Sequence, residues 1–224
     1  LERRLNMIRV EVKGDFACFS RPEFKAERVS YDIITPSAAR GVLESVFWHP
    51  GMKYYIDKIY LLSKISFANI KRNEVASKAS ASNIQKVMNG NNSLLYLATS
   101  LDIQQRATML LKNVHYIIEA HFDMTDKANE TDNPGKFQEM IKRRLRKGQN
   151  YYQSYLGCRE FPAQVSLFEG DISLLKLAYS EEEKDLGFML YDMDYSDKNN
   201  IVPMFFRAVL KNGVLDLTDC EVHK

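Results

Sequence analysis

The sequence predicts an α+β fold in which helices pack on an antiparallel sheet, of the ferredoxin-like kind. Two observations lead to this prediction. Segments with strand and helix patterns follow one another in the order strand, helix, strand, loop, strand, helix. Near the end of the chain, two apolar runs flank an Asn-Gly pair, which is typical of a β-hairpin. The main domain is therefore expected to be followed by a small β-rich region.

The chain begins with a strand and a helix. Residues 8–12 alternate apolar and charged side chains, which is the period of a half-buried strand, and Gly14 interrupts the pattern. Thr35 is a good N-cap, Pro36 suits the first helical position, and apolar residues then recur at helical spacing. We expect a helix over about 36–48.

A second strand and a polar segment follow this helix. The tripeptide His-Pro-Gly at 49–51 ends the helix, and residues 53–62 are rich in tyrosine and isoleucine, as an extended segment should be. Residues 63–93 are polar and show little periodicity, apart from a short helical segment near 83–88. We interpret 63–93 as a long, mobile insertion.

The clearest strand and a second helix come next. In 114–123 the even-numbered residues are apolar and face the core, while the odd-numbered face carries His115 and His121. Asn133 and the following proline begin a helix, and Gly148 is placed to end it. The exposed surface of this helix is predicted to be strongly basic.

These elements divide the chain into two parts. We predict a ferredoxin-like domain over 7–160, with the insertion inside it, and a β-rich C-terminal region over 161–224. The Asn-Gly pair at 212–213 places a hairpin at the end of that region. Residues 1–6 precede the first strand and are left out of the fold prediction.

Composition excludes several classes of protein. The chain has 224 residues, of which 45% are hydrophobic and 27% charged, as in ordinary globular domains, and its net charge of +2 does not by itself indicate a nucleic-acid partner. Its three cysteines lie far apart and lack C-x-x-C spacing, so we expect no disulfide framework, no metal site and no cofactor. No run approaches the roughly 18 apolar residues of a membrane span. We expect a cytoplasmic protein with no membrane partner.

The basic segment between Lys136 and Arg159 is the strongest functional signal. Five of the six residues at 142–147 are cationic, and they form a basic collar: Lys142, Arg143, Arg144, Arg146 and Lys147. Such a collar attracts phosphates without reading sequence. Tyr151, Tyr152 and Arg159 follow, and rings interleaved with cations are what stacking on unpaired RNA bases requires. The alternative is a solvated helix face whose charges suit the C-terminal end of the helix dipole.

Three further residues have open interpretations. His115 and His121 share a strand face, but six residues at about 3.3 Å each place them roughly 20 Å apart, so they cannot share a metal. Glu119 and Asp123 flank His121, and a carboxylate partner would raise its pKa or fix its tautomer. Equally, His121 can be an ordinary surface histidine. Trp48, the single tryptophan, is expected to pack in the core.

Long, ordered segments carry a resemblance to a known family. They are Gly14–Pro22, Glu27–Tyr31, Thr35–Gly41, Glu44–Trp48, Gln105–Arg106, Tyr116–Phe122 and Tyr155–Ala163. Together they resemble the CRISPR-associated RAMP protein of the type I-C (Dvulg) system, the d-type member of the Cas-five family. The resemblance spans nearly the whole chain and implies a ferredoxin-like RAMP domain followed by a smaller β-rich part.

The resemblance also implies an activity. Members cleave each repeat of the CRISPR precursor RNA, stay bound to the 5′ tag of the resulting crRNA, and join the other subunits of the type I-C Cascade surveillance complex. Cleavage is metal-independent: the 2′-hydroxyl attacks the adjacent phosphorus and leaves a 2′,3′-cyclic phosphate. The alternative is a non-catalytic, crRNA-binding structural subunit. The basic collar would also permit nonspecific binding of double-stranded DNA.

The family's catalytic pattern is only partly present. The resemblance implies a tyrosine at the end of the first helix together with a lysine and a histidine. Phe47, which has no hydroxyl, occupies the tyrosine position, and Ala120 falls near the lysine position, so only His121 is retained. Either Lys112, Arg106 or another cation replaces the lysine, or cleavage is slow. We expect catalysis at His121, Phe47 and Lys112. RNA contacts are expected from Arg40, Arg106, His115, the collar, Tyr151, Tyr152 and Arg159.

Overall fold

The computed structural model describes residues 6–24, 26–197 and 199–224, so 1–5 of the excluded N-terminal residues lie outside it. Within these ranges the strands form one ten-stranded sheet. The strands are β1 (Ile8–Ala17), β2 (Arg28–Val29), β3 (Met52–Leu61), β4 (Phe67–Val75), β5 (Ile103–Met124), β6 (Gln164–Leu167), β7 (Glu183–Asp194), β8 (Val202–Lys211), β9 (Val214–Asp216) and β10 (Val222–His223). The helices are α2 (Pro36–Val46), α3 (Ala81–Met88), α4 (Pro134–Lys147) and two 3₁₀ turns, Thr99–Leu101 and Ile172–Leu174.

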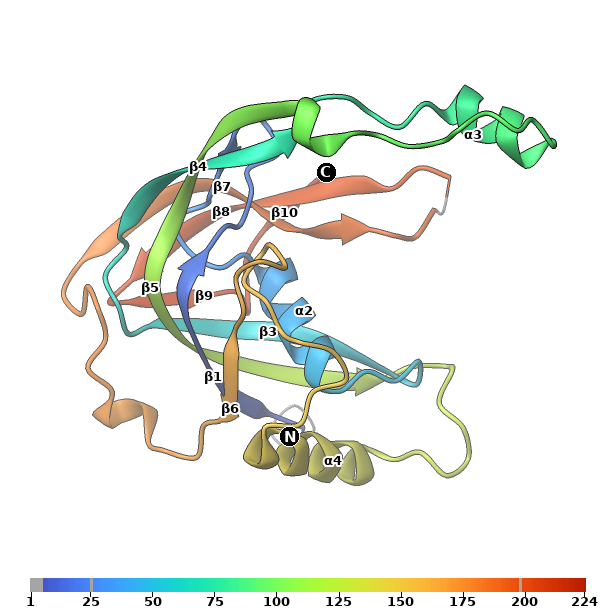
Figure 1. Ribbon diagram of the computed structural model, residues 1–224. Helices are drawn as coiled ribbons and strands as arrows, with labels where there is room; N and C mark the ends of the chain where they lie inside the picture. Colours follow the sequence, from blue (N-terminus) through green and yellow to red (C-terminus); the bar gives the residue numbers. More distant parts are fainter. Residues whose placement is uncertain (1–5, 25, 198) are drawn as a thin grey trace.

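The centre of the molecule is a ferredoxin-like unit. Its elements follow one another as β1, α2, β3, β5, α4 and β6, and its strands lie in the order β3-β5-β1-β6 with antiparallel neighbours. This is the βαββαβ arrangement. In Figure 1 the sheet is strongly curved, and α2 lies inside the curve with α4 below it. The predicted fold class is confirmed.

Strand alternation and helix caps produce this unit as the sequence predicts. Ile8 pairs with Ala120 and Val10 with Ile118, so the apolar sides of β1 and β5 face α2 and α4 together. Thr35 accepts a hydrogen bond from the Ala38 N–H (3.2 Å). At α4, the Asn133 side chain accepts from the Lys136 N–H, and Gly148 ends the helix in the left-handed conformation. The core lies between the sheet and these two helices.

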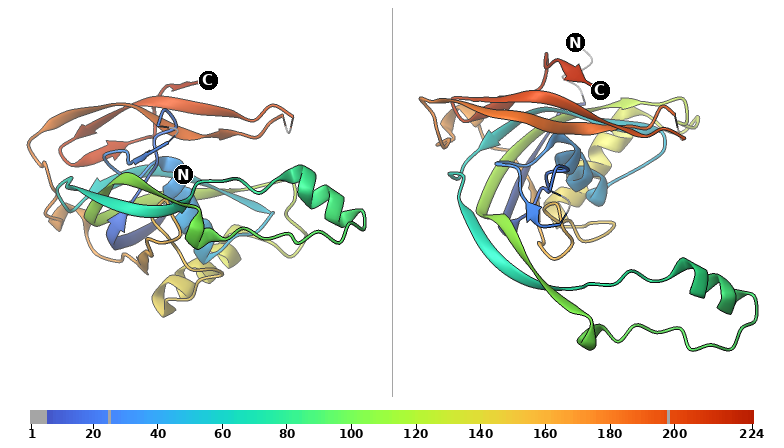
Figure 2. Two further views of the ribbon diagram at one scale, coloured as in Figure 1. Left: turned by 45° about the horizontal axis from the view of Figure 1, so that its top comes forward. Right: turned by 90° about the horizontal axis from the view of Figure 1, so that it is seen from above.

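Strands β1 and β5 are longer than predicted, and strand β4 was missed. The first strand continues through Gly14 to Ala17; a Cβ at Gly14 would lie 2.3 Å from Leu156 Cδ1, so glycine permits close packing of the segment after α4. Within 63–93, where no strand was predicted, β4 pairs with the first half of β5. The interpretation of this segment as a mobile insertion stays a prediction. Figure 2 shows α3 at the far end of the arm that this pair begins. Neither face of β4 is fully buried. Its sequence therefore lacks the alternation of apolar and polar residues by which a strand is predicted.

The C-terminal region extends the same sheet. Asn212 and Gly213 both have positive φ and join β8 to β9, which confirms the predicted hairpin. Strand β9 also pairs with β3, and β7 lies beyond β8. The division of the chain after residue 160 stays a prediction. No helix of the described residues is both long and apolar enough to cross a membrane.

Candidate active site and nucleic-acid interface

His121 lies on β5 with its side chain on the face turned away from α2 and α4. Tyr55 of β3 is directly opposite, and the two rings stack with centroids 5.3 Å apart. Both carboxylate oxygens of Asp57 lie 2.8 and 2.9 Å from Nδ1 of His121. The histidine is only 6% exposed. Asp57 therefore orients the ring and holds the proton on Nδ1, which leaves Nε2 as the nitrogen available for proton transfer.

Asp57 is not one of the carboxylates that the sequence suggested. Glu119 instead forms an ion pair with Arg9 (2.8 Å), and the described ion pairs of His121 do not include Asp123. Asp57 shares the odd-numbered face of β3 with Tyr55 and lies at an irregularity in the pairing of β3 with β5. The sequence contained this alternation, but it did not reveal that these two strands are neighbours.

Phe47 lies on the other side of the sheet from His121. It is the buried C-cap of α2, and its ring packs against Phe137 of α4 (5.7 Å between centroids). Phe122, which follows His121 on β5, packs against the same Phe137 ring, and neighbouring residues of a strand point to opposite faces. The sheet therefore separates the Phe47 ring from His121, and a catalytic role for Phe47 stays a prediction that this placement does not support.

Lys112 is also far from His121. Nine residues of β5 separate them, which corresponds to about 30 Å along an extended strand, and Lys112 is exposed. Arg106 lies farther along the same strand, where it bonds to Gln104 (3.0 Å). The structure does not bring either cation to His121. Instead, Nζ of Lys53 lies 5.2 Å from the centroid of the Tyr55 ring that stacks on His121.

His115, another predicted RNA contact, is held in an ion pair. Nε2 of His115 lies 2.8 Å from Glu11, and Lys13 also contacts that carboxylate (2.8 Å). Burial would raise the pKa of Glu11, but the hydrogen bonds from Lys13 and His115 lower it, so the carboxylate stays ionised. Sequence reasoning did not anticipate that His115 has this acidic partner.

Arg40 connects α2 to β7. Its Nε and Nη2 donate to the two carboxylate oxygens of Asp192 (3.0 and 2.9 Å), and its Nη1 donates to Glu44 (2.6 Å). Burial would lower the pKa of Arg40, but the hydrogen bonds to Asp192 raise it overall. Two carboxylates thus neutralise the guanidinium, and its contacts are those of a structural ion pair.

The basic collar divides into paired and unpaired cations. Arg144 is half-buried: it donates to the Val46 carbonyl (2.7 Å) and lies over the Phe47 ring (5.2 Å). Arg146 pairs with Glu169 (2.7 Å). The other three, Lys142, Arg143 and Lys147, form no ion pair within the described part of the chain. These three are the collar cations whose charge is available to bind a phosphate.

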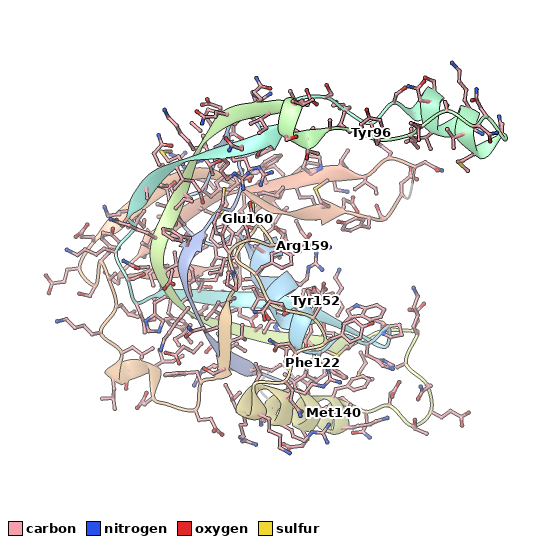
Figure 3. The ribbon with its side chains drawn as sticks, viewed as in Figure 1. Tyr96, Phe122, Met140, Tyr152, Arg159 and Glu160 are labelled. Carbon is pink, nitrogen blue, oxygen red and sulfur yellow. The ribbon has the colours of Figure 1, made fainter. Side chains whose placement is uncertain are left out.

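The tyrosines after α4 lie beside the end of α2. The backbone N–H groups of Tyr151 and Tyr152 both point to the Ser45 carbonyl (2.8 and 3.4 Å). Their rings meet edge to face at 6.1 Å. Burial, followed by neighbouring acidic groups, raises the pKa of Tyr152, so its hydroxyl remains protonated at neutral pH. Figure 3 shows Arg159 on the same side of the molecule as Tyr152.

Trp48 is not in the core. The chain leaves α2 in an extended conformation at Phe47, which places the Phe47 ring inside and leaves Trp48 59% exposed. The prediction of a core tryptophan is wrong, because helical spacing ends at the C-cap and the inward position falls one residue earlier. We call the ends of α2 and α4 together with Trp48, Tyr151 and Tyr152 the aromatic–basic end. Among the described residues, no group of three His, Cys, Asp or Glu could hold a metal ion.

Comparison with known proteins identifies the family. The model of a CRISPR-associated protein family, Cas_Cas5d, matches residues 7–218. This chain belongs to the Cas5d family. A relative described as the CRISPR pre-crRNA endoribonuclease Cas5d of Mannheimia succiniciproducens is 48% identical over 215 residues, which are 95% of each protein. A second protein of that description, from Thermus thermophilus, is 36% identical over 94% of this chain and 90% of its own length. The resemblance inferred from the sequence is confirmed.

Solved structures agree on the fold. The crystal structure of a CRISPR-associated protein matches with a TM-score of 0.70 at 21% identity, covering 97% of this chain and 96% of its own. A functionally uncharacterized protein of Streptococcus mutans matches with a TM-score of 0.68 at 19% identity, covering 97% of each chain. Phe47 and Ala120 are both buried, and both lie on the helix side of the sheet, on the face opposite to His121.

Proposed function

We propose that this Cas5d-family chain is a metal-independent endoribonuclease that cleaves CRISPR precursor RNA within its repeats. The main support for this proposal is the 48% identity, over 95% of both chains, to a protein described as a pre-crRNA endoribonuclease. After cleavage the protein stays bound to the 5′ tag and serves as a subunit of the type I-C Cascade complex. Three free thiols, at Cys18, Cys158 and Cys220, support a reducing cytoplasmic location.

The chemistry assigned to the site uses the His121–Asp57 pair. Nε2 of His121 takes the proton of the 2′-hydroxyl, whose oxygen then attacks the adjacent phosphorus and displaces the 5′-oxygen. Asp57 stabilises the imidazolium that forms. Lys53 supplies positive charge near the developing phosphorane, the role for which Lys112 is too distant. The displaced 5′-oxygen takes up a proton from Lys53 or solvent, so the products are a 2′,3′-cyclic phosphate and a 5′-hydroxyl.

The test is cleavage of the protein's own repeat hairpin in EDTA. We expect one cut per repeat, a cyclic phosphate on the upstream product, and a rate that falls about 10²–10⁴-fold in His121→Ala. His115→Ala is the matched control, since it removes a histidine from the same strand and face with a different carboxylate partner. Absence of cleavage at any enzyme excess would refute the enzymatic proposal.

A second candidate function is a non-catalytic, crRNA-binding subunit. The substitution of Phe47 and Ala120 for the family's hydroxyl and cation, and the distance of Lys112 from His121, favour it. RNA binding would then persist, and His121→Ala would leave any trace of cleavage unchanged. The three unpaired collar cations also support nonspecific binding of double-stranded DNA. That affinity must fall steeply between low and moderate salt; a flat salt dependence would contradict it.

A further inference from the structure

The end of α2 is held by donors from three other segments. The Ser45 carbonyl accepts from the Tyr151 N–H (2.8 Å), and the next carbonyl, of Val46, accepts from Arg144 (2.7 Å). The Phe47 carbonyl accepts from the Tyr54 hydroxyl (3.0 Å). Carbonyls at a helix C-terminus lack partners in their own helix. Here they fix the ends of α2 and α4 and the segment after α4 to one another.

Three aromatic rings on this fixed frame remain in solvent. Trp48 follows the bonded carbonyls directly and is 59% exposed, while Tyr151 is 80% and Tyr152 44% exposed. The backbone N–H groups of Tyr151 and Tyr152 point to the Ser45 carbonyl, and Trp48 lies three residues after Ser45 in the chain. Large aromatic side chains usually bury most of their surface, and exposed apolar groups that gather in one place mark an interaction site.

The charged residues of this end indicate which class of ligand it can bind. Arg143 and Lys147 are exposed on the last turns of α4 and form no ion pair within the described residues, and Arg159 is exposed on the same side of the molecule as Tyr152 (Figure 3). Glu44, the acidic residue on the last turn of α2, is held by Arg40 (2.6 Å). Unpaired cations beside exposed rings suit a ligand that carries both planar bases and phosphates.

We propose that Trp48, Tyr151 and Tyr152 form a stacking platform for unpaired RNA bases, with Arg143 and Lys147 holding the adjacent phosphates. This inference rests on the proposed function, which identifies the ligand as RNA, and it adds the place on the protein where the RNA strand binds. Rings stack on bases only where those bases are not already stacked within a duplex. The platform therefore binds a single-stranded flank of the repeat and not its paired stem.

The single tryptophan of the chain makes the test direct. The full-length protein is titrated with the single-stranded flank of its repeat, with the isolated stem duplex as comparison, while Trp48 emission is followed. We expect saturable quenching by the single strand and little by the duplex. Loss of one stacking ring in Trp48→Ala should weaken binding of the single strand about tenfold, whereas Trp48→Phe, which keeps a ring, should lose much less.

A matched control distinguishes the platform from general loss of apolar surface. Phe188 of β7 is 58% exposed, as Trp48 is, but lies outside the collar, so Phe188→Ala should leave affinity for the single strand unchanged. Labelled RNA measures affinity independently of emission. One result would overturn the platform and leave the proposed function intact. In that result, the wild-type protein binds and cuts the RNA without a change in Trp48 emission, and Trp48→Ala binds and cuts it equally well.

Two other results would also overturn the platform. Failure of the wild-type protein to bind or cut repeat RNA would overturn the proposed function with it. Unchanged RNA affinity in Trp48→Ala, together with loss of binding to another purified subunit of the complex, would identify a protein-docking surface instead.

Discussion

The aromatic–basic end and the His121–Asp57 pair differ in how their charges are used. At the first, Arg143 and Lys147 are exposed and have no carboxylate partner among the residues that the structure describes. Around the second, carboxylates neutralise the charged side chains: Asp57 holds His121, and Glu119 holds Arg9. The first is suited to attract a polyanion, and the second to hold one imidazole in a fixed orientation. RNA binding and RNA cleavage should therefore respond to different substitutions.

The two regions lie on opposite faces of the sheet but near the same end of it. Strands β3 and β5 pair Met52 with Met124 at that end, five residues after the C-cap of α2. His121 is three residues from Met124, or about 10 Å along the strand. Both regions are therefore close to the same end of the paired strands β3 and β5.

Asp57→Asn should produce the largest effect on the cleavage side of the comparison. The amide keeps the size of the side chain but removes the charge that stabilises the imidazolium, so we expect single-turnover cleavage to fall about 10²-fold or more. Affinity for repeat RNA should change less than twofold. A similar loss of affinity and rate would show that the two regions are not separable.

Removing two of the three unpaired collar cations should affect binding instead. For the double variant Arg143→Ala, Lys147→Ala we expect affinity for single-stranded repeat RNA to fall about tenfold at moderate salt. The slope of log affinity against log salt should become less steep by about 1.4, since each lost phosphate contact contributes about 0.7 on single strands. Cleavage at saturating protein should remain at the wild-type rate. An unchanged salt slope would remove the collar from the RNA interface.

Arg144 should act mainly through stability, unlike its neighbour Arg143. Its hydrogen bond to the Val46 carbonyl and its position over the Phe47 ring should make Arg144→Met lower the free energy of unfolding by about 1–3 kcal/mol. Arg143→Met, on the exposed side of the same helix, should stay within about 0.5 kcal/mol. Urea unfolding of both variants measures the difference; equal values would contradict the structural role of Arg144.

The smallest expected effect is that of introducing the tyrosine that the resemblance implied at position 47. Because Phe47 lies across the sheet from His121, Phe47→Tyr should not increase cleavage of the repeat. Burying its hydroxyl among Phe137 and the α4 side chains should instead cost stability. A gain of tenfold or more in rate would show that catalysis takes place on the helix side.

Local signals in the sequence predicted most of the fold. The alternation of β1 and β5, the caps Thr35 and Asn133, and the Asn-Gly hairpin each depend on a few neighbouring residues, and each appears in the structure. Strand β4 was missed because its stability comes from backbone pairing with β5 and neither of its faces is buried. A pattern search for apolar faces cannot detect such a ribbon.

The site depends on contacts between distant segments, so less of it could be predicted. His121 was identified by family likeness, but its partner Asp57 comes from a strand 64 residues away. The opposite placement of Ala120 and His121 follows from strand alternation alone, yet which face the end of α2 covers depends on tertiary packing. For the same reason, Arg40 and His115 had the residue type of an RNA contact, while their acidic partners remained hidden.

A comparison of two histidines tests whether cleavage takes place at His121 and not at the aromatic–basic end. His49 is the histidine of that end: it follows Trp48, and its ring packs against Phe137 (4.9 Å). Single-turnover cleavage of the repeat in EDTA should fall at least about 10²-fold in His121→Ala and remain near the wild-type rate in His49→Ala. Loss of cleavage in His49→Ala, with His121→Ala fully active, would contradict this account and place the reaction on the helix side.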